Sequence, residues 1–165
     1  MRIRDLFDRG GPVFSFEFFP PKTDEGERKL LETVHRLKEL GPSFVSVTKT
    51  GGKPAEATVN LTARLKHEVG VEAMAHMTCA TAGRTEMRRI FELIRDSGIE
   101  NVLPLRGDPP ADQPDFVRPP DGFGGVDTRN HNICAIVVEV VDFFGGVKGH
   151  TGDVEPEANP CDVEF

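Results

Sequence analysis

The sequence has no long hydrophobic run and relatively few basic residues, and both shortages limit what the protein can do. No apolar run in the 165 residues approaches the roughly 20 that a membrane-spanning helix needs, and Met1–Arg4 leads into Asp5 rather than into a signal-peptide stretch. We therefore expect a cytoplasmic protein with no membrane partner. The 27 acidic residues outnumber the 20 Lys and Arg residues, for a formal net charge of -7. No nucleic-acid partner is expected, because phosphate binding depends on basic side chains.

Cysteines and the common ligand-binding motifs are also scarce. Cys79, Cys134 and Cys161 lie far apart and form no C-x-x-C pair, which indicates reduced thiols rather than a disulfide framework. Cys79 follows an apolar segment and is expected to pack in the core rather than to act as a nucleophile. The chain has no G-x-G-x-x-G or P-loop sequence, and no second His or Cys at zinc-ligand spacing from His76. The sequence thus predicts no metal site and argues against a Rossmann-type dehydrogenase.

The chain does contain a repeated unit, because four apolar segments begin 28 to 31 residues apart. They are Val13–Phe19, Phe44–Thr48, Glu72–Thr78 and Asn101–Arg106. Amphipathic helical patterns lie between them, at about 23–40, 55–69 and 84–97. This order and spacing predict a single α/β domain over residues 1–165, with parallel strands joined by right-handed crossovers.

Alternation along the segments predicts which side chains share a face of the sheet. Phe14, Phe16 and Phe18 share one face and are expected to pack under helices, while Ser15 and Glu17 share the other. The same rule groups three further polar sets: Ser46 with Thr48, Met74 with His76, and Arg106 with Asp108 opposite Leu103 and Leu105. We expect these sets to converge on the inside of one sheet, near the carboxyl ends of the strands, where parallel barrels bind their ligands.

Glu17, His76 and Asp108 are the candidates for chemistry. Glu17 lies among phenylalanines, and an apolar environment would raise its pKa and make it a general acid; the alternative is a structural ion pair with Arg106. For His76 the sequence leaves open a ligand-binding role and a satisfied histidine in the core. Asp108 follows Gly107, which allows close approach of the backbone to a ligand.

The second part of the chain is less regular. Proline and glycine crowd residues 111–132, and residues 145–165 show almost no apolar period, so both stretches are expected to be irregular. The apolar run from Ile133 to Val141 is rich in β-branched residues and favours a strand, although a buried helix has a similar pattern.

Four motifs occur in order: Phe14-Ser-Phe-Glu-Phe-Phe-Pro-Pro-Lys22, Phe44-Val-Ser-Val-Thr48, Ala75-His-Met-Thr-Cys79 and Leu105-Arg-Gly-Asp-Pro-Pro110. Over about residues 13–110 the chain resembles the methylenetetrahydrofolate reductase family. The resemblance implies a TIM-type (β/α)8 barrel and an FAD-dependent oxidoreductase of one-carbon metabolism and methionine biosynthesis. It further implies the reduction of 5,10-methylenetetrahydrofolate to 5-methyltetrahydrofolate with NADH or NADPH.

The resemblance also implies roles for individual residues. Glu17 matches the general acid that protonates a folate ring nitrogen and opens the five-membered ring to an iminium that accepts hydride. Asp108 matches the aspartate beside the flavin and the folate pterin, and is therefore a catalytic, substrate-binding and cofactor-binding candidate. Thr48, His76, Arg106 and Gly107 match positions that hold the flavin.

The sequence departs from the family pattern in two places. After Thr48 the family usually continues with Tyr-Gly-Ala-Gly-Gly, whereas this chain has Lys49-Thr-Gly-Gly-Lys53. Beyond Asp115 the family's next helix and strand are not recognisable. A complete barrel needs about 250 residues, so we expect only the first four to five βα units here, with open sheet edges that favour a homo-oligomer.

Several alternatives stay open at this point. The chain could be a catalytically silent half-barrel that only oligomerises or binds a partner, or a TIM-barrel lyase or transferase that shares only the fold. A truncated or frame-disrupted product, an isolated half-barrel and one part of a complementing pair are equally compatible with the sequence. The choice between NADH and NADPH, the effect of Lys49 and the order of residues 117–165 are not decided by it.

Overall fold

The computed structural model describes residues 1–49, 53–79, 81–105, 107, 116–117, 119–120 and 138–139. The elements within these residues are α1 (Arg4–Asp8), β1 (Ser15–Phe18), α2 (Asp24–Leu37), a 3-10 turn (Lys38–Leu40), β2 (Phe44–Val47), α3 (Ala55–Arg64), a π turn (Leu65–Val69), β3 (Ala73–Thr78), α4 (Arg84–Asp96), β4 (Asn101–Leu105) and β5 (Val138–Glu139). Each of β1 to β4 lies inside its predicted range. The stretches 111–132 and 145–165, predicted to be irregular, lie outside the described residues apart from 116–117 and 119–120.

Helices α2, α3 and α4 begin and end close to where the sequence signals predict. Thr23 caps α2, since its Oγ1 accepts a hydrogen bond from the Gly26 amide at 3.1 Å. Gly41 and Gly70 follow the turns that prolong α2 and α3, and both adopt the left-handed conformation, with φ of 65° and 72°. In the described part of the chain, no helix is long and apolar enough to cross a membrane.

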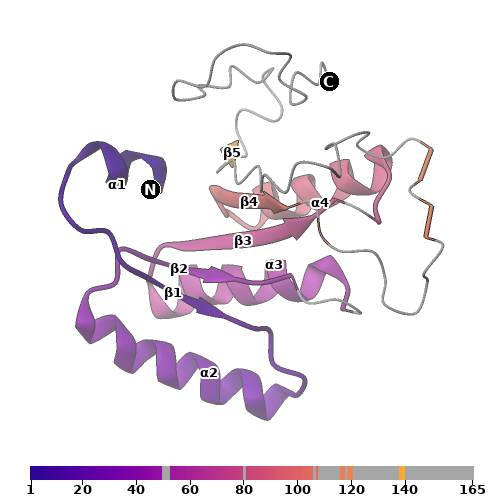
Figure 1. Ribbon diagram of the computed structural model, residues 1–165. Coiled ribbons are helices and arrows are strands. Elements are labelled where there is room, and N and C mark those ends of the chain that lie inside the picture. Colours follow the sequence, from indigo (N-terminus) through magenta and orange to yellow (C-terminus); the bar gives the residue numbers. More distant parts are fainter. Residues whose placement is uncertain are drawn as a thin grey trace.

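The strands form one sheet in the order β1-β2-β3-β4-β5, and β1 to β4 are parallel (Figure 1). Helices α2, α3 and α4 lie along one side of this sheet. The strand predicted over 133–141 is observed at Val138–Glu139, and it pairs with β4 in the antiparallel direction. The described residues therefore contain a parallel, four-stranded α/β sheet, and its parallel order ends at β4.

The helix-covered side of the sheet holds most of the core. Val45, Val47 and Ala73 pack against Leu31 and Val34 of α2, together with Leu61, Leu65, Val69 and Val71. Met77 and Val102 pack against the apolar side of α4, which consists of Met87, Ile90, Phe91 and Ile94. Burying one such aliphatic or aromatic side chain contributes about 1.5–3 kcal/mol, so these contacts are the main stabilisation of the sheet.

The predicted packing of the three phenylalanines is correct for two of them. Phe16 and Phe18 pack against the α2 side of the core. Phe14 remains 46% exposed, so its predicted burial under a helix is wrong. It precedes the first residue of β1 and instead contacts Phe16 in an edge-on arrangement, with ring centroids 6.2 Å apart.

Helix α1 lies on the other side of the sheet and was not foreseen, because a five-residue helix is too short to show an apolar period. Ile3, at 1% exposure, packs there with Phe44 and Met74 and with the half-buried side chains of Leu6, Val13 and Leu103. These apolar contacts fill the inner face toward the amino-terminal ends of the strands.

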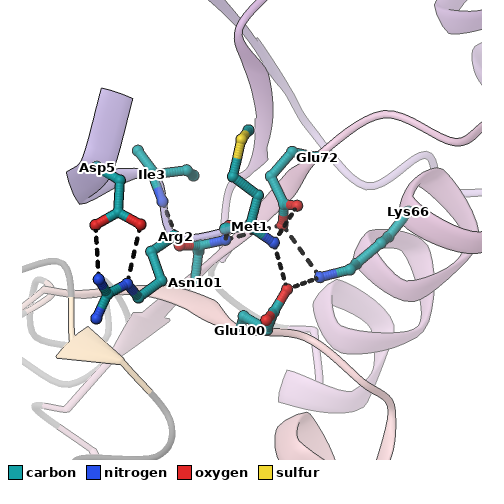
Figure 2. A network of polar contacts seen from close by, with 8 residues as sticks. All are labelled: Met1, Arg2, Ile3, Asp5, Lys66, Glu72, Glu100 and Asn101. Atoms are coloured by element: carbon teal, nitrogen blue, oxygen red, sulfur yellow. Dashed lines mark hydrogen bonds and ion pairs between the residues drawn. The ribbon is translucent and has the colours of Figure 1, made fainter. Parts of the chain in front are cut away.

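A polar network holds the α1 segment in place (Figure 2). Asn101, the first residue of β4, accepts a hydrogen bond from the Ile3 amide at 2.9 Å. Its Nδ2 donates to the Met1 carbonyl and to Glu72 Oε1, both at 2.9 Å. Asn101 therefore links the chain's first residues to the start of β4 and to the residue before β3.

Four charges surround Asn101 in this network. The Met1 amino group lies 2.9 Å from Glu72 Oε2 and 2.6 Å from Glu100 Oε2. Lys66 Nζ lies 3.1 Å from Glu72 Oε1 and 2.7 Å from Glu100 Oε2. Hydrogen bonds from Lys66 and from the amino group lower the pKa of Glu100 to about 2. Two cations are thus balanced by two carboxylates at the end of the sheet opposite to the predicted ligand-binding end.

We expect Asn101→Ala to lower the free energy of unfolding by about 1–3 kcal/mol, because the Ile3 amide would lose its buried acceptor. Urea denaturation measures the change. Asn60→Ala is the matched control, since Asn60 is exposed on α3. Equal midpoints for the two variants would contradict the role given to Asn101.

Candidate functional site

Three of the predicted site residues lie in the carboxyl-terminal halves of β1 and β3 or directly after β2. Glu17 of β1 pairs in register with Ser46 of β2, and Ser46 pairs with Met74 of β3. Thr48 and His76 each lie two residues beyond Ser46 and Met74. Because residues paired in register point to the same face, and residues two apart along a strand do so as well, Glu17, Thr48 and His76 share the inner face. The predicted convergence of polar groups is therefore confirmed for β1 to β3.

Glu17 and His76 approach each other across this face. His76 Nδ1 lies 4.0 Å from Glu17 Oε1, and the two side chains are 8% and 54% exposed, respectively. Burial lowers the pKa of His76 from its ordinary value, while the Glu17 carboxylate opposes that shift. At neutral pH the balance favours an uncharged imidazole beside a carboxylate, a pair that can hold or exchange a proton with a ligand.

The apolar environment predicted for Glu17 is wrong. Phe16 and Phe18, its neighbours in sequence, point to the opposite face and pack toward α2. The carboxylate itself is more than half exposed on the inner face. The error has a simple cause, because adjacent residues in a strand point in opposite directions and do not surround one another. The role of Glu17 as a general acid stays a prediction.

Thr48 presents a buried hydroxyl that has no hydrogen-bond partner among the described residues. Both main-chain polar groups of Thr48 are hydrogen-bonded. The amide donates to the Phe18 carbonyl at 2.9 Å, and the carbonyl accepts from Thr58 Oγ1 at 3.1 Å. The residue is only 8% exposed. A buried hydroxyl without a partner costs free energy, so this position suits a ligand with a polar atom.

The alternation predicted at the end of β4 is wrong. Leu103 and Leu105 pair in register with His76 and Thr78, so the two leucines lie on the inner face rather than opposite to it. The first residue of the strand already determines which side chains face inward, because Asn101 pairs with Met74 of the inner face. Arg106 and Asp108 lie outside the described residues, and with them the alternative ion pair between Arg106 and Glu17.

Gly107 is held close to the end of β3. Its φ is 76°, and a Cβ atom added there would lie 2.8 Å from Thr78 Cβ. A larger residue would therefore be strained and would also clash with Thr78. The close approach that the sequence suggested for a ligand is, in this structure, an approach to a neighbouring strand end.

Cys79 belongs to the core, as predicted. It packs against the α4 side of the core, and burial raises the pKa of its thiol to about 11. A thiol with so high a pKa is a poor nucleophile near neutral pH. The described residues contain no group of three or more His, Cys, Asp or Glu that could hold a metal ion.

Sequence reasoning missed the contacts made by the two lysines after β2. Lys53 Nζ donates to the carbonyls of Pro20 at 3.0 Å and Pro21 at 2.5 Å. Lys49 Nζ donates to the Lys53 carbonyl at 2.5 Å, and burial lowers the pKa of Lys49. The departure from the family pattern after Thr48 was the available signal, but no sequence pattern indicates which groups accept these hydrogen bonds.

We expect Glu17→Gln to lower the pKa of His76 further, because the substitution removes the negative charge that favours the imidazolium. NMR titration of the His76 ring resonances measures the shift. Glu25→Gln is the control, since Glu25 pairs with Lys29 on the exposed side of α2. An unchanged His76 titration in Glu17→Gln would show that the two side chains do not interact.

Comparisons with known proteins identify a family for this chain. The profile of the family described as Methylenetetrahydrofolate reductase matches residues 2–162. The chain is 39% identical to Methylenetetrahydrofolate reductase (NADH) 1 of Arabidopsis thaliana over an alignment of 166 positions, which covers 99% of this chain and 26% of that protein. It is 34% identical to 5,10-methylenetetrahydrofolate reductase of Salmonella typhimurium over 152 residues, which are 92% of this chain and 48% of that protein.

The chain spans about a quarter of the length of the plant relative and about half that of the bacterial one. The family profile nevertheless covers nearly every residue of the chain. This chain belongs to the methylenetetrahydrofolate reductase family.

Proposed function

We propose that this chain supplies the flavin and folate site of a reductase that converts 5,10-methylenetetrahydrofolate to 5-methyltetrahydrofolate with NADH or NADPH. The observation that carries the proposal is the convergence of Glu17, Thr48 and His76 on the inner face of three adjacent parallel strands. Family membership supports the choice of this reaction for the site. We further propose that the parallel sheet is the first part of a (β/α)8 barrel, whose ligands bind at the carboxyl ends of the strands.

The residues present are suited to FAD. Thr48 offers a buried hydroxyl that a polar atom of the isoalloxazine ring would satisfy. His76 offers a largely buried, uncharged imidazole, which can donate or accept a hydrogen bond. When bound, FAD accepts hydride from the nicotinamide and passes it to the folate. By family resemblance, Arg106, Gly107 and Asp108 would complete the flavin site, and Asp108 would also contact the pterin.

Glu17 is proposed to protonate the folate ring nitrogen. Its exposed carboxyl group on the inner face can be reached by a ligand. A bound pterin would exclude water from that face.

We expect Thr48→Val to bind FAD more weakly, by about tenfold, because the variant keeps the shape of the side chain but loses one hydrogen bond. The stability of the protein without ligand should stay the same or rise, since an unsatisfied hydroxyl is removed. Fluorescence titration with FAD and urea denaturation measure the two effects. The control is Thr33→Val, whose hydroxyl donates to the Lys29 carbonyl on α2. Unchanged FAD affinity would contradict the proposed contact.

For Glu17→Gln we expect FAD reduction by NADH to persist while the transfer of hydride to methylenetetrahydrofolate slows by at least about 100-fold, as for the loss of a general acid. Stopped-flow absorbance separates these two half-reactions. Glu25→Gln, on the exposed side of α2, should change neither rate. Full-rate folate reduction by Glu17→Gln with flavin bound would exclude the general-acid role.

A second candidate function is that of an oligomerising half-barrel without catalysis. It is favoured by the position of β1, which is the first strand of the sheet and pairs with β2 alone among the described residues. Phe14 and Phe19, at either end of this strand, are 46% and 68% exposed. Such an edge can pair with a strand of another chain. This candidate predicts a stable homo-oligomer that binds no flavin.

A further inference from the structure

The segment that follows β1 has few backbone attachments. The amide of Thr48 donates to the Phe18 carbonyl, and this is the bond that continues the β1–β2 ladder to the end of β1. Phe19, the next residue, is 68% exposed. An edge strand that is bonded on one side tends to fray at its end. Whatever holds Pro20 and Pro21 therefore also limits the movement of β1.

Lys53 is the residue that holds them. Its ammonium group donates to both proline carbonyls, at 3.0 and 2.5 Å. Proline has no amide hydrogen, so each carbonyl is the only main-chain hydrogen-bonding group of its residue. Charge-assisted bonds of this kind are about twice as strong as neutral ones. Lys49 secures the arrangement, because its Nζ donates to the carbonyl of Lys53.

The helix α2 fixes the prolines from the other direction. A Cβ atom added at Gly26 would lie 3.0 Å from Pro21 Cβ, so Pro21 fits closely against the first turn of the helix. Thr23, two residues after Pro21, caps that turn. The Pro20–Pro21 segment is thus held between Lys53 on one loop and the start of α2.

We propose that Lys53 is a positioning residue for Glu17: by binding the carbonyls of Pro20 and Pro21 it holds the end of β1 against β2 and keeps the Glu17 carboxylate beside His76. The inference rests on the proposed function for its catalytic meaning. Because the bonds from Lys53 go to the segment that follows β1, its loss should affect the chemistry assigned to Glu17 rather than flavin binding.

The first test does not require activity. In Lys53→Met we expect the His76 pKa, followed by NMR titration, to fall toward its value in Glu17→Gln, because the carboxylate would move away from the imidazole. Lys53→Arg, which keeps a cationic donor, should restore the original value. Lys29→Met on the exposed side of α2 is the control. Lys53→Gln replaces Lys53→Met if the methionine variant does not fold. An unchanged His76 titration in a folded variant would overturn the proposal.

The second test uses the reaction. We expect Lys53→Met to slow folate reduction by about 10- to 100-fold, the effect of a small misplacement of a catalytic group, with flavin reduction by NADH changed less than twofold. When Glu17 is already replaced by Gln, adding Lys53→Met should slow folate reduction no further. If Lys53→Met slows folate reduction by the same factor with and without the Glu17→Gln substitution, the proposal is overturned. If the unmodified chain reduces no folate, the proposed function fails, and the His76 titration still decides the role of Lys53.

Discussion

The parallel register of β1, β2 and β3 is the constraint on which the rest of the site depends. Pairing Glu17 with Ser46 and Ser46 with Met74 places polar side chains from three strands on one face. A shift of one residue in any strand would exchange that strand's inner and outer side chains. The register is fixed by apolar packing, since Val45, Val47 and Ala73 of the opposite face are fully buried under the helices.

The two ends of the inner face differ in how their polar groups are paired. The amino-terminal end stabilises the fold, and the carboxyl-terminal end carries the candidate site. At the amino-terminal end, Ile3 packs on Phe44 and Met74, and Asn101 uses both its donor and its acceptor within the network of Figure 2. Toward the carboxyl-terminal end, Glu17 is exposed and the Thr48 hydroxyl has no partner among the described residues. Satisfied polar groups stabilise a fold, whereas unsatisfied ones are available to a ligand.

Sequence patterns predicted the elements well because spacing and capping are local properties. The strand ranges and the inner position of His76 follow from a period of 2 residues, and the Thr23 cap follows from a threonine placed directly before acidic residues. Properties that depend on tertiary contacts were predicted wrongly or not at all. The environment of Glu17 was inferred from sequence neighbours that point the other way, and the bonds from Lys53 to the two prolines join residues more than 30 positions apart.

The most direct test of the central claim is gel filtration of the purified chain with added FAD, with the visible absorption spectrum and the mass in solution recorded together. Because Glu17, Thr48 and His76 converge on one face, the account predicts a flavin band that co-elutes with the protein at one FAD per chain. A colourless oligomer would contradict the account and would support the half-barrel without catalysis. A colourless monomer would also contradict it, since the residues of the family site would then be present without forming a site.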